Sequence, residues 1–267
     1  MESHLVASMC LEQKLCYYLS PLMLFVVCVV CPIILTFFGL CLFRRIVASS
    51  FLKQNHDVTG PFFSTLGTVY GIFLAFVVST MWQQFSTTST NLVQEARYLG
   101  DLYFATKAFA QPEQGELQQL LRNYRDSVVN EEWKSMEQGE ANPKSRQLLE
   151  QIGSVYMHYK PNNESENEFL HVSIQYVTSM TGLRTSRIDD SSSGLIPLLW
   201  VVLLIGAAAT IFCSFLFEAR NFRIQAVMTI LLTGVICMTF YTIIDLDFPF
   251  TGGTTVSPEP LQSLKMQ

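Results

Sequence analysis

The chain has 267 residues, of which 49% are hydrophobic and only 15% are charged. Soluble domains carry roughly 25% charged residues on average, so this composition predicts an integral membrane protein whose main partner is the lipid bilayer. The formal net charge of −5 lacks the basic excess that nucleic-acid binding requires, and we predict no nucleic-acid partner.

Four apolar segments are long enough to cross a bilayer, which takes about 20 residues. They cover approximately residues 19–43, 62–82, 195–217 and 224–244. Short loops join the first to the second and the third to the fourth, and a long polar stretch separates the two pairs. We therefore predict an all-α integral membrane protein in which two transmembrane hairpins flank a helical extramembrane domain.

These boundaries divide the chain into five parts. They are an N-terminal segment (1–18), the first transmembrane hairpin (19–82), the helical extramembrane domain (83–194), the second hairpin (195–244) and a C-terminal tail (245–267).

The polar stretch has the periodicity of amphipathic helices. Leu92, Ala96, Leu99 and Tyr103 recur every three or four residues and predict a helix that Pro112 ends. Further helices are predicted around 117–128, 144–159 and 168–187, with a break at Asn142-Pro143. The second span and the helix at Leu92 form either one long rod or two helices separated near the N-cap candidates Ser86–Ser89.

The second span carries a stripe of small residues. Gly67, Gly71, Ala75 and Ser79 recur every four residues, so they lie along one slowly drifting line on a helix. One interpretation is close packing against the first, third or fourth span, because small residues let helices approach in lipid. The other is a pore-facing helix on which the hydroxyls of Ser64, Thr65 and Thr68 contact dehydrating ions.

In the pore interpretation, aromatic side chains of the same span are candidates for a constriction. They are Phe62, Phe63, Phe73 and Phe76. The two interpretations are compatible if the helix uses two different faces.

Two carboxylates, Asp245 and Asp247, directly follow the fourth span. Ionisable groups at a membrane boundary are candidates for function, and here they predict either a pore-mouth ring that attracts cations or a metal site. The alternative is a helix end with solvated carboxylates. Arg184 and Arg187 precede the third span, and we consider them possible ion-pair partners of the two aspartates.

No catalytic constellation is present. The hydrolase, Walker A and HExxH patterns are missing, and the four histidines are scattered. We therefore predict no catalytic residue, no resident metal and no cofactor, and we do not expect an enzyme. A metal-dependent activity at Asp245 and Asp247 is the one alternative that would make the protein an enzyme.

The basic residues near the span ends predict the orientation in the cell membrane. The two short loops carry Arg44, Arg45, Lys53, Arg220 and Arg223, and the opposite side carries Lys14, Arg97, Arg184 and Arg187. The positive-inside rule then places the short loops in the cytoplasm, and both termini and the helical domain outside it.

Several motifs together resemble the bacterial bestrophin-like family, also called DUF4239. In the second span these are Gly60-Pro61-Phe62-Phe63, Gly67-Thr68-Val69-Tyr70-Gly71, Phe73-Leu74-Ala75-Phe76 and Trp82-Gln83-Gln84-Phe85. Beyond it they are Glu95-Ala96, Leu99-Gly100-Asp101-Leu102-Tyr103, Arg122 with Tyr124, Glu132-Trp133, Arg187, Pro197 with Leu199-Trp200, Asp247-Phe248-Pro249-Phe250-Thr251-Gly252 and Val256-Ser257-Pro258.

The resemblance extends over about residues 57–260, with Phe248 where many members are expected to carry a charge. It implies a homo-oligomeric, pentameric channel for inorganic ions, with the second span lining the pore. It also implies that the helical domain is cytosolic. The basic residues predict the opposite orientation, and we retain the orientation that they predict. The alternative function is a non-conducting membrane scaffold or sensor that binds a partner through its helical domain.

Overall fold

A computed structural model describes residues 19–47, 56–217 and 221–266, and over these residues the secondary structure is helical, with no strand. The described chain forms two compact units. Among the described residues, the membrane unit comprises 19–47, 56–83, 194–217 and 221–247, and the helical unit comprises 84–193 and 248–266. The predicted all-α class is confirmed.

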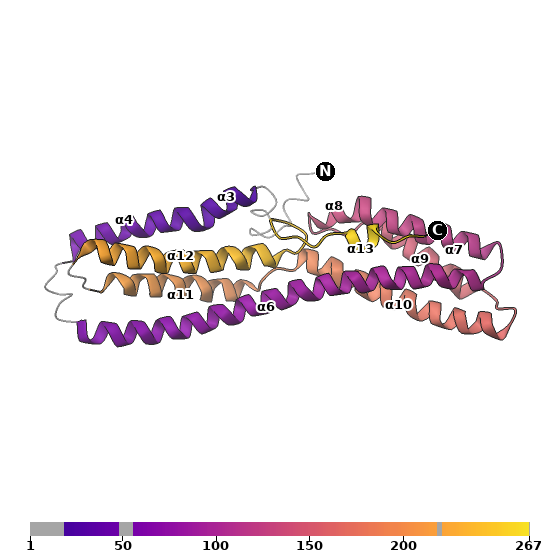
Figure 1. The fold of residues 1–267 in the computed structure, drawn as a ribbon, viewed down its shortest axis with the longest axis horizontal. Helices are drawn as coiled ribbons and strands as arrows, with labels where there is room; N and C mark the ends of the chain where they lie inside the picture. The colour runs from indigo at the N-terminus through magenta and orange to yellow at the C-terminus, as the bar shows by residue number, and fades with distance from the viewer. Residues whose placement is uncertain (1–18, 48–55, 218–220, 267) are drawn as a thin grey trace. The chain divides into compact units, whose positions relative to one another are not determined.

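Four helices are long and apolar enough to cross a membrane, as predicted from hydropathy. The first span consists of α3 (Pro21–Phe25), a π-helical turn (Val26–Val30) and α4 (Cys31–Ile46). The other three are α6 (His56–Ala105), α11 (Pro197–Phe215) and α12 (Phe222–Asp247) (Figure 1). Residues 1–18, 48–55 and 218–220, which include Lys14, Lys53 and Arg220, lie outside the description.

Helix α6 begins earlier than its sequence predicts, and it forms the long rod that was one of the two predicted alternatives. It begins at His56, so Pro61 lies inside the helix and not at its start. It also runs unbroken through Ser86–Ser89. The hydroxyls of Thr88 and Thr90 explain this continuity, because each donates to the carbonyl four residues earlier, at 3.0 and 2.9 Å, and does not cap a new helix.

Arg44 and Gln225 join the ends of three membrane helices. Arg44 Nε donates to Gln225 Oε1 at 2.8 Å, and its Nη2 donates to the Phe217 carbonyl at 3.1 Å. Gln225 Nε2 donates to the same carbonyl at 2.8 Å. The last carbonyl oxygens of a helix have no hydrogen-bond donor within the helix. Here Arg44 and Gln225 supply donors at the end of α11.

A close contact joins α6 to α11. The Tyr70 hydroxyl donates to the Leu203 carbonyl at 2.9 Å, and the Tyr70 ring lies over Gly206. A Cβ on Gly206 would overlap with Tyr70 Cε2, so only glycine fits below the ring in this position. A small residue here lets the two helices approach closely.

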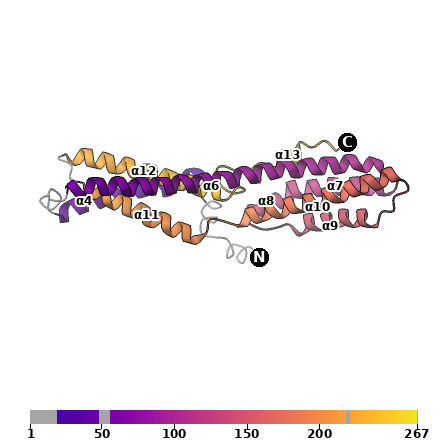
Figure 2. The same cartoon turned by 90° about the horizontal axis from the view of Figure 1, so that it is seen from below.

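The helical unit is built from the C-terminal part of α6 and a set of shorter helices. These are the 3-10 turn Thr106–Ala108, α7 (Glu113–Ser127), a π-helical turn (Val128–Glu132), α8 (Trp133–Met136), α9 (Pro143–His158), α10 (Glu164–Ser192) and α13 (Glu259–Gln262) (Figure 2). Helix α6 ends at Ala105, several residues before Pro112.

The core of the helical unit follows the predicted apolar faces. Fully buried side chains come from α6, α7, α9 and α10: Leu92, Leu99, Leu102, Leu117, Leu121, Tyr124, Ile152, Tyr156 and Met180. The helix starts are capped by asparagines. Asn142 accepts from Lys144 N at 2.7 Å and Asn163 from Glu166 N at 2.8 Å, which explains the predicted break at Asn142-Pro143.

The contact at Gly206 predicts a large effect from one methyl group. Gly206→Ala should lower the thermal unfolding midpoint in detergent, because overpacking a filled site costs about 1–3 kcal/mol. Gly67→Ala is the matched control, since a Cβ there meets nothing within 4 Å among the described residues. Equal midpoints for the two variants would show that Tyr70 does not hold α6 against α11.

Candidate functional site

Helix α6 has two different sides within the membrane unit. Its inner side buries four apolar residues, Tyr70, Leu74, Val77 and Met81. Its outer side exposes five of the six small or hydroxyl-bearing candidates, Ser64, Thr68, Gly71, Ala75 and Ser79, and Gly67 is half-buried between the two sides. We call this outer surface the small face.

The small face is open within a single chain. A Cβ built on Gly67 or Gly71 meets no described heavy atom within 4 Å. The described parts of the first, third and fourth spans therefore do not pack against these two glycines. Of the hydroxyls on this face, that of Thr68 donates to the Ser64 carbonyl of its own helix at 2.7 Å, and its oxygen retains lone pairs that can accept.

The aromatic constriction candidates lie on other sides of α6. Phe62 is 60% exposed, Phe76 is 69% exposed, and Phe73 is half-buried. Phe73 follows Gly71 by two residues, and two residues turn a helix by about 200°. Phe62 precedes Ser64 by the same interval. These two rings and the small face therefore point in nearly opposite directions, and Phe76 is turned by about 100° from Ala75.

The two aspartates at the end of α12 are buried. Asp245 is 8% exposed and Asp247 is 2% exposed. Asp247 Oδ2 accepts a hydrogen bond from the Leu195 backbone N–H at 3.0 Å, close to the start of α11. In a single chain these carboxylates therefore lie inside the protein and not on an open surface. No group of three or more His, Cys, Asp or Glu suited to a metal occurs in the described part of the chain.

A buried network of charges occupies the centre of the helical unit. Arg187, on α10, is 1% exposed and lies between two carboxylates. Its Nε donates to Glu95 Oε2 at 2.8 Å, and its Nη2 donates to Glu95 Oε1 at 3.0 Å and to Glu132 Oε1 at 2.9 Å. Because Glu95 is on α6 and Glu132 is in the π-helical turn after α7, one guanidinium joins three segments.

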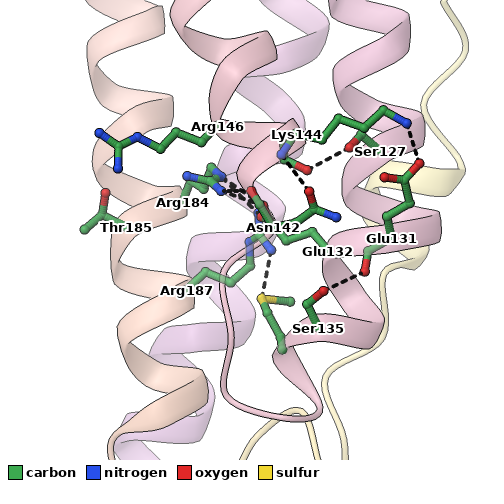
Figure 3. Close-up of polar contacts among 12 residues, drawn as sticks. Ser127, Glu131, Glu132, Ser135, Asn142, Lys144, Arg146, Arg184, Thr185 and Arg187 are labelled. Carbon is green, nitrogen blue, oxygen red and sulfur yellow. Dashed lines mark hydrogen bonds and ion pairs between the residues drawn. The ribbon is translucent and has the colours of Figure 1, made fainter. Parts of the chain in front are cut away.

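A second arginine completes this network. Arg184 Nη2 donates to Glu132 Oε2 at 2.6 Å and to the Asn142 carbonyl at 3.2 Å. In Figure 3 both arginines point from α10 toward Glu132, and Arg146 extends away from the network. The suggested pairing of these two arginines with Asp245 and Asp247 is thus replaced by pairing with glutamates of the helical unit.

The electrostatic effects follow from burial and close charges. Burial lowers the pKa of Arg187, but the attraction of Glu95 and Glu132 outweighs it, so the pKa lies above its ordinary value. Burial, followed by the negative charge of Glu95, raises the pKa of Tyr124 well above its ordinary value. The Tyr124 hydroxyl donates to Glu95 Oε1 at 2.8 Å, so it remains a donor over the physiological pH range.

The C-terminal tail covers the network. The Arg187 guanidinium carbon lies over the Trp133 ring, 5.6 Å from its centroid, and Phe250 makes a T-shaped contact with Trp133 at 5.4 Å between centroids. Thr251 Oγ1 donates to the Glu137 carbonyl at 3.0 Å. Gly252 turns the tail with a φ of 107°, which favours glycine.

The network was not predicted from sequence, although most of its residues lie in the motifs quoted above. Glu95 gave one usable signal. It lies on the same helical face as Leu92 and Leu99, and a carboxylate on an apolar face requires a buried cationic partner. Its partner Arg187 is too far along the chain for any spacing rule to identify.

Fold and composition together define a multi-pass, all-α membrane protein. The family model described as "Bestrophin-like domain" matches residues 30–261. The chain therefore belongs to the bestrophin-like family, and the resemblance predicted from the motifs is confirmed. No curated protein matches the chain.

Solved structures share the fold at low sequence identity. A variant of a bacterial bestrophin homologue from Klebsiella pneumoniae matches with a TM-score of 0.65 and 11% identity, covering 90% of this chain and 99% of that one. A second variant of that homologue matches at 0.62 and 12%, covering 87% and 96%. A structure described only as a membrane protein matches at 0.62 and 12%, covering 87% and 94%.

The network predicts that Arg187 is essential for the stability of the helical unit. Arg187→Gln leaves two carboxylates buried beside a neutral group, and removing one member of a buried ion pair costs about 3–5 kcal/mol. We expect a large fall in the thermal midpoint in detergent. Arg146→Gln is the control, because Arg146 is 73% exposed and pairs with Glu150 on the surface of α9. Similar midpoints for the two variants would contradict the assignment.

Proposed function

We propose that the chain is the subunit of a homo-oligomeric ion channel in which α6 lines the pore. The observation that carries this proposal is the small face of α6, a membrane-spanning surface of glycine, alanine and hydroxyl-bearing residues that the described parts of its own chain leave open. Membership of the bestrophin-like family supports the proposal.

The chemistry of the two exposed sides of α6 favours this orientation. Large apolar side chains such as Phe62 and Val69 suit contact with lipid or with a neighbouring helix. Small residues and hydroxyls suit either close helix packing or a water-filled lumen. Around a central axis, the small face of each subunit leaves space for ions and offers the hydroxyl oxygens of Ser64, Thr68 and Ser79.

Several finer features belong to the same proposal. The lining residues are Ser64, Gly67, Thr68, Gly71, Ala75 and Ser79, the permeating species are inorganic ions, and the family resemblance implies five subunits. Phe76 is the one aromatic candidate close enough in register to narrow the lumen. The pore mouth is built without Asp245 and Asp247, because both are buried. The proposed activity is passive conduction and not catalysis.

The scaffold or sensor alternative rests on a groove between α9 and α10 of the helical unit. The groove has a volume of about 720 Å³, and Leu149, Met157 and Val177 are among its lining residues. Met157 is 76% exposed. A non-conducting protein that binds a partner here would explain this surface, but it would not explain the small face of α6.

Conduction and lining are tested together by cysteine accessibility. In a variant with its native cysteines replaced, Ala75→Cys and Ser79→Cys should each lose most ion current in liposomes after treatment with a charged, thiol-specific methanethiosulfonate reagent. Val69→Cys, at an exposed position turned by about 120° from Ala75, is the matched control and should change little. Gly71→Leu should abolish current while the oligomer stays intact.

Three outcomes would count against the proposal. A strictly monomeric protein without ion flux would reject the channel. Inhibition of Val69→Cys without inhibition of Ala75→Cys would reject this lining face. A Gly71→Leu variant that fails to assemble would favour helix packing on the small face, as the scaffold alternative requires.

We also propose a cell (inner) membrane location with the helical unit outside the cytoplasm, following the basic residues Arg44, Arg45 and Arg223 beside the short loops. A single cysteine at the exposed position Met157 should react with a membrane-impermeant maleimide in intact cells. Labelling only after lysis would reverse the orientation, which is the result that the family resemblance implies.

A further inference from the structure

The end of α4, beside the start of α12 in the membrane unit, carries an arginine whose partners are all neutral (Figure 1). Arg44 Nε donates to Gln225 Oε1 at 2.8 Å, and its Nη2 donates to the same oxygen and to the Phe217 carbonyl. The two N–H groups of Nη1 have no partner among the described residues, and no described carboxylate pairs with this guanidinium. Because partly buried charges are normally paired, Arg44 is a candidate for binding an anion.

The C-terminal end of α11 compensates the charge of Arg44 only in part. The dipole of a helix places about half a negative elementary charge at its C-terminus. Gln225 shares these carbonyls with Arg44, because its Nε2 donates to the Phe215 and Phe217 carbonyls at 3.2 and 2.8 Å. A full guanidinium charge therefore exceeds what this helix end supplies, and the remainder attracts an anion.

Two exposed arginines lie at the same end of the membrane unit. Arg45 follows Arg44 in the last turn of α4, and Arg223 is the second residue of α12, two residues before Gln225. Both are exposed, and neither forms a hydrogen bond or an ion pair with a described residue. Arg223 lies in the first turn of its helix, where the dipole is positive and also favours an anion.

The sequence of the two short connections is positive as a whole. Residues 44–57 and 218–225 contain five arginines and lysines but only two carboxylates, those of Asp57 and Glu218. Even with both carboxylates counted, the basic residues are in excess by three. An anion is therefore the kind of ligand that complements this end of the unit.

The apolar surroundings of the arginines indicate which kind of anion fits. Leu42, three residues before Arg45, is exposed, and so is Val227, four residues after Arg223. Residues three or four apart share a helix face, so each exposed arginine lies one turn beyond an exposed apolar residue, at the end of a membrane-spanning helix. A free phosphate would contact only the arginines, whereas a phospholipid would contact both the arginines and the apolar faces.

We propose that Arg44, Arg45 and Arg223 form a binding site for an anionic phospholipid at this end of the membrane unit. The free N–H groups of Arg44 donate to the lipid phosphate, because a guanidinium presents its donors in a fixed geometry that matches phosphate oxygens. Arg45 and Arg223 attract the headgroup, and the acyl chains lie along the faces of Leu42 and Val227. Basic pockets between membrane helices recognise anionic headgroups in this way. The site lies within the membrane unit and does not depend on whether the protein conducts ions.

The experiment titrates phosphatidylglycerol into the purified protein in a neutral detergent and follows the thermal unfolding midpoint. The midpoint of the wild type should rise and saturate, and added salt should weaken the effect because salt screens exposed charges. Phosphatidylcholine with the same acyl chains carries no net charge and should stabilise the protein much less. Glycerol 3-phosphate, which has the phosphate without the chains, should have no effect at the same concentration.

The variants separate lipid binding from folding. Arg45→Gln and Arg223→Gln should keep the wild-type midpoint without lipid, because neither side chain bonds to a described residue. Each should raise the lipid concentration for half-maximal stabilisation several-fold, and the double variant should raise it further. Arg44→Gln should abolish saturation and also lower the midpoint without lipid, because it loses its bonds to Gln225. Arg146→Gln, which removes an exposed arginine from α9 of the helical unit, is the control and should bind lipid like the wild type.

Four outcomes would overturn the proposal, and none of them bears on ion conduction. They are a wild type that phosphatidylglycerol does not stabilise, and equal stabilisation by phosphatidylcholine, which would show a general lipid effect. Stabilisation by glycerol 3-phosphate would identify a free phosphate as the ligand and reject the lipid. An unchanged half-saturating concentration in the double variant, or the same change in Arg146→Gln, would reject the role of these arginines.

Discussion

The ion pair between Arg187 and Glu95 determines which side of α6 faces outward in the helical unit. Both side chains are about 1% exposed, so neither charge can return to water without unfolding the surrounding core. Buried charges are tolerated only when their hydrogen bonds are nearly complete, and here Glu132, Tyr124 and the sulfur of Met136 supply the remaining partners. With Glu95 held inward, Arg97 must point outward, since two residues turn the helix by about 200°.

A neutral contact performs the same task in the membrane unit. Charged pairs are costly in lipid, and there the inner side of α6 is held by the Tyr70 hydroxyl on the Leu203 carbonyl and by the close fit of its ring over Gly206. Each unit thus anchors its own part of α6 with a chemistry suited to its surroundings. In the membrane unit this anchor leaves Ser64, Thr68, Gly71, Ala75 and Ser79 exposed.

Hydropathy and helical periodicity predicted the number of spans, the all-α class and the break at Asn142-Pro143, because these features depend on local residues. The start of α6 was missed. Its continuity past Ser86–Ser89 was left open, since hydroxyls that can cap a helix also bond within one, and local sequence does not decide between these states. The partners of Arg184 and Arg187 depend on tertiary contacts with residues far along the chain. By contrast, the separation of Phe62 and Phe73 from the small face follows from residue numbers alone.

The buried network also explains why so few residues control the field along α6. Arg184 and Arg187 are balanced by Glu95 and Glu132, so these four charges stabilise the helical unit and contribute little net potential outside it. A chain with a net charge of −5 can therefore present a locally positive surface, because interaction with an ion depends on nearby unscreened charges more than on the total. Arg97 is such a charge, because its side chain is 79% exposed and its nearest carboxylate, on Asp101, is itself in contact with solvent.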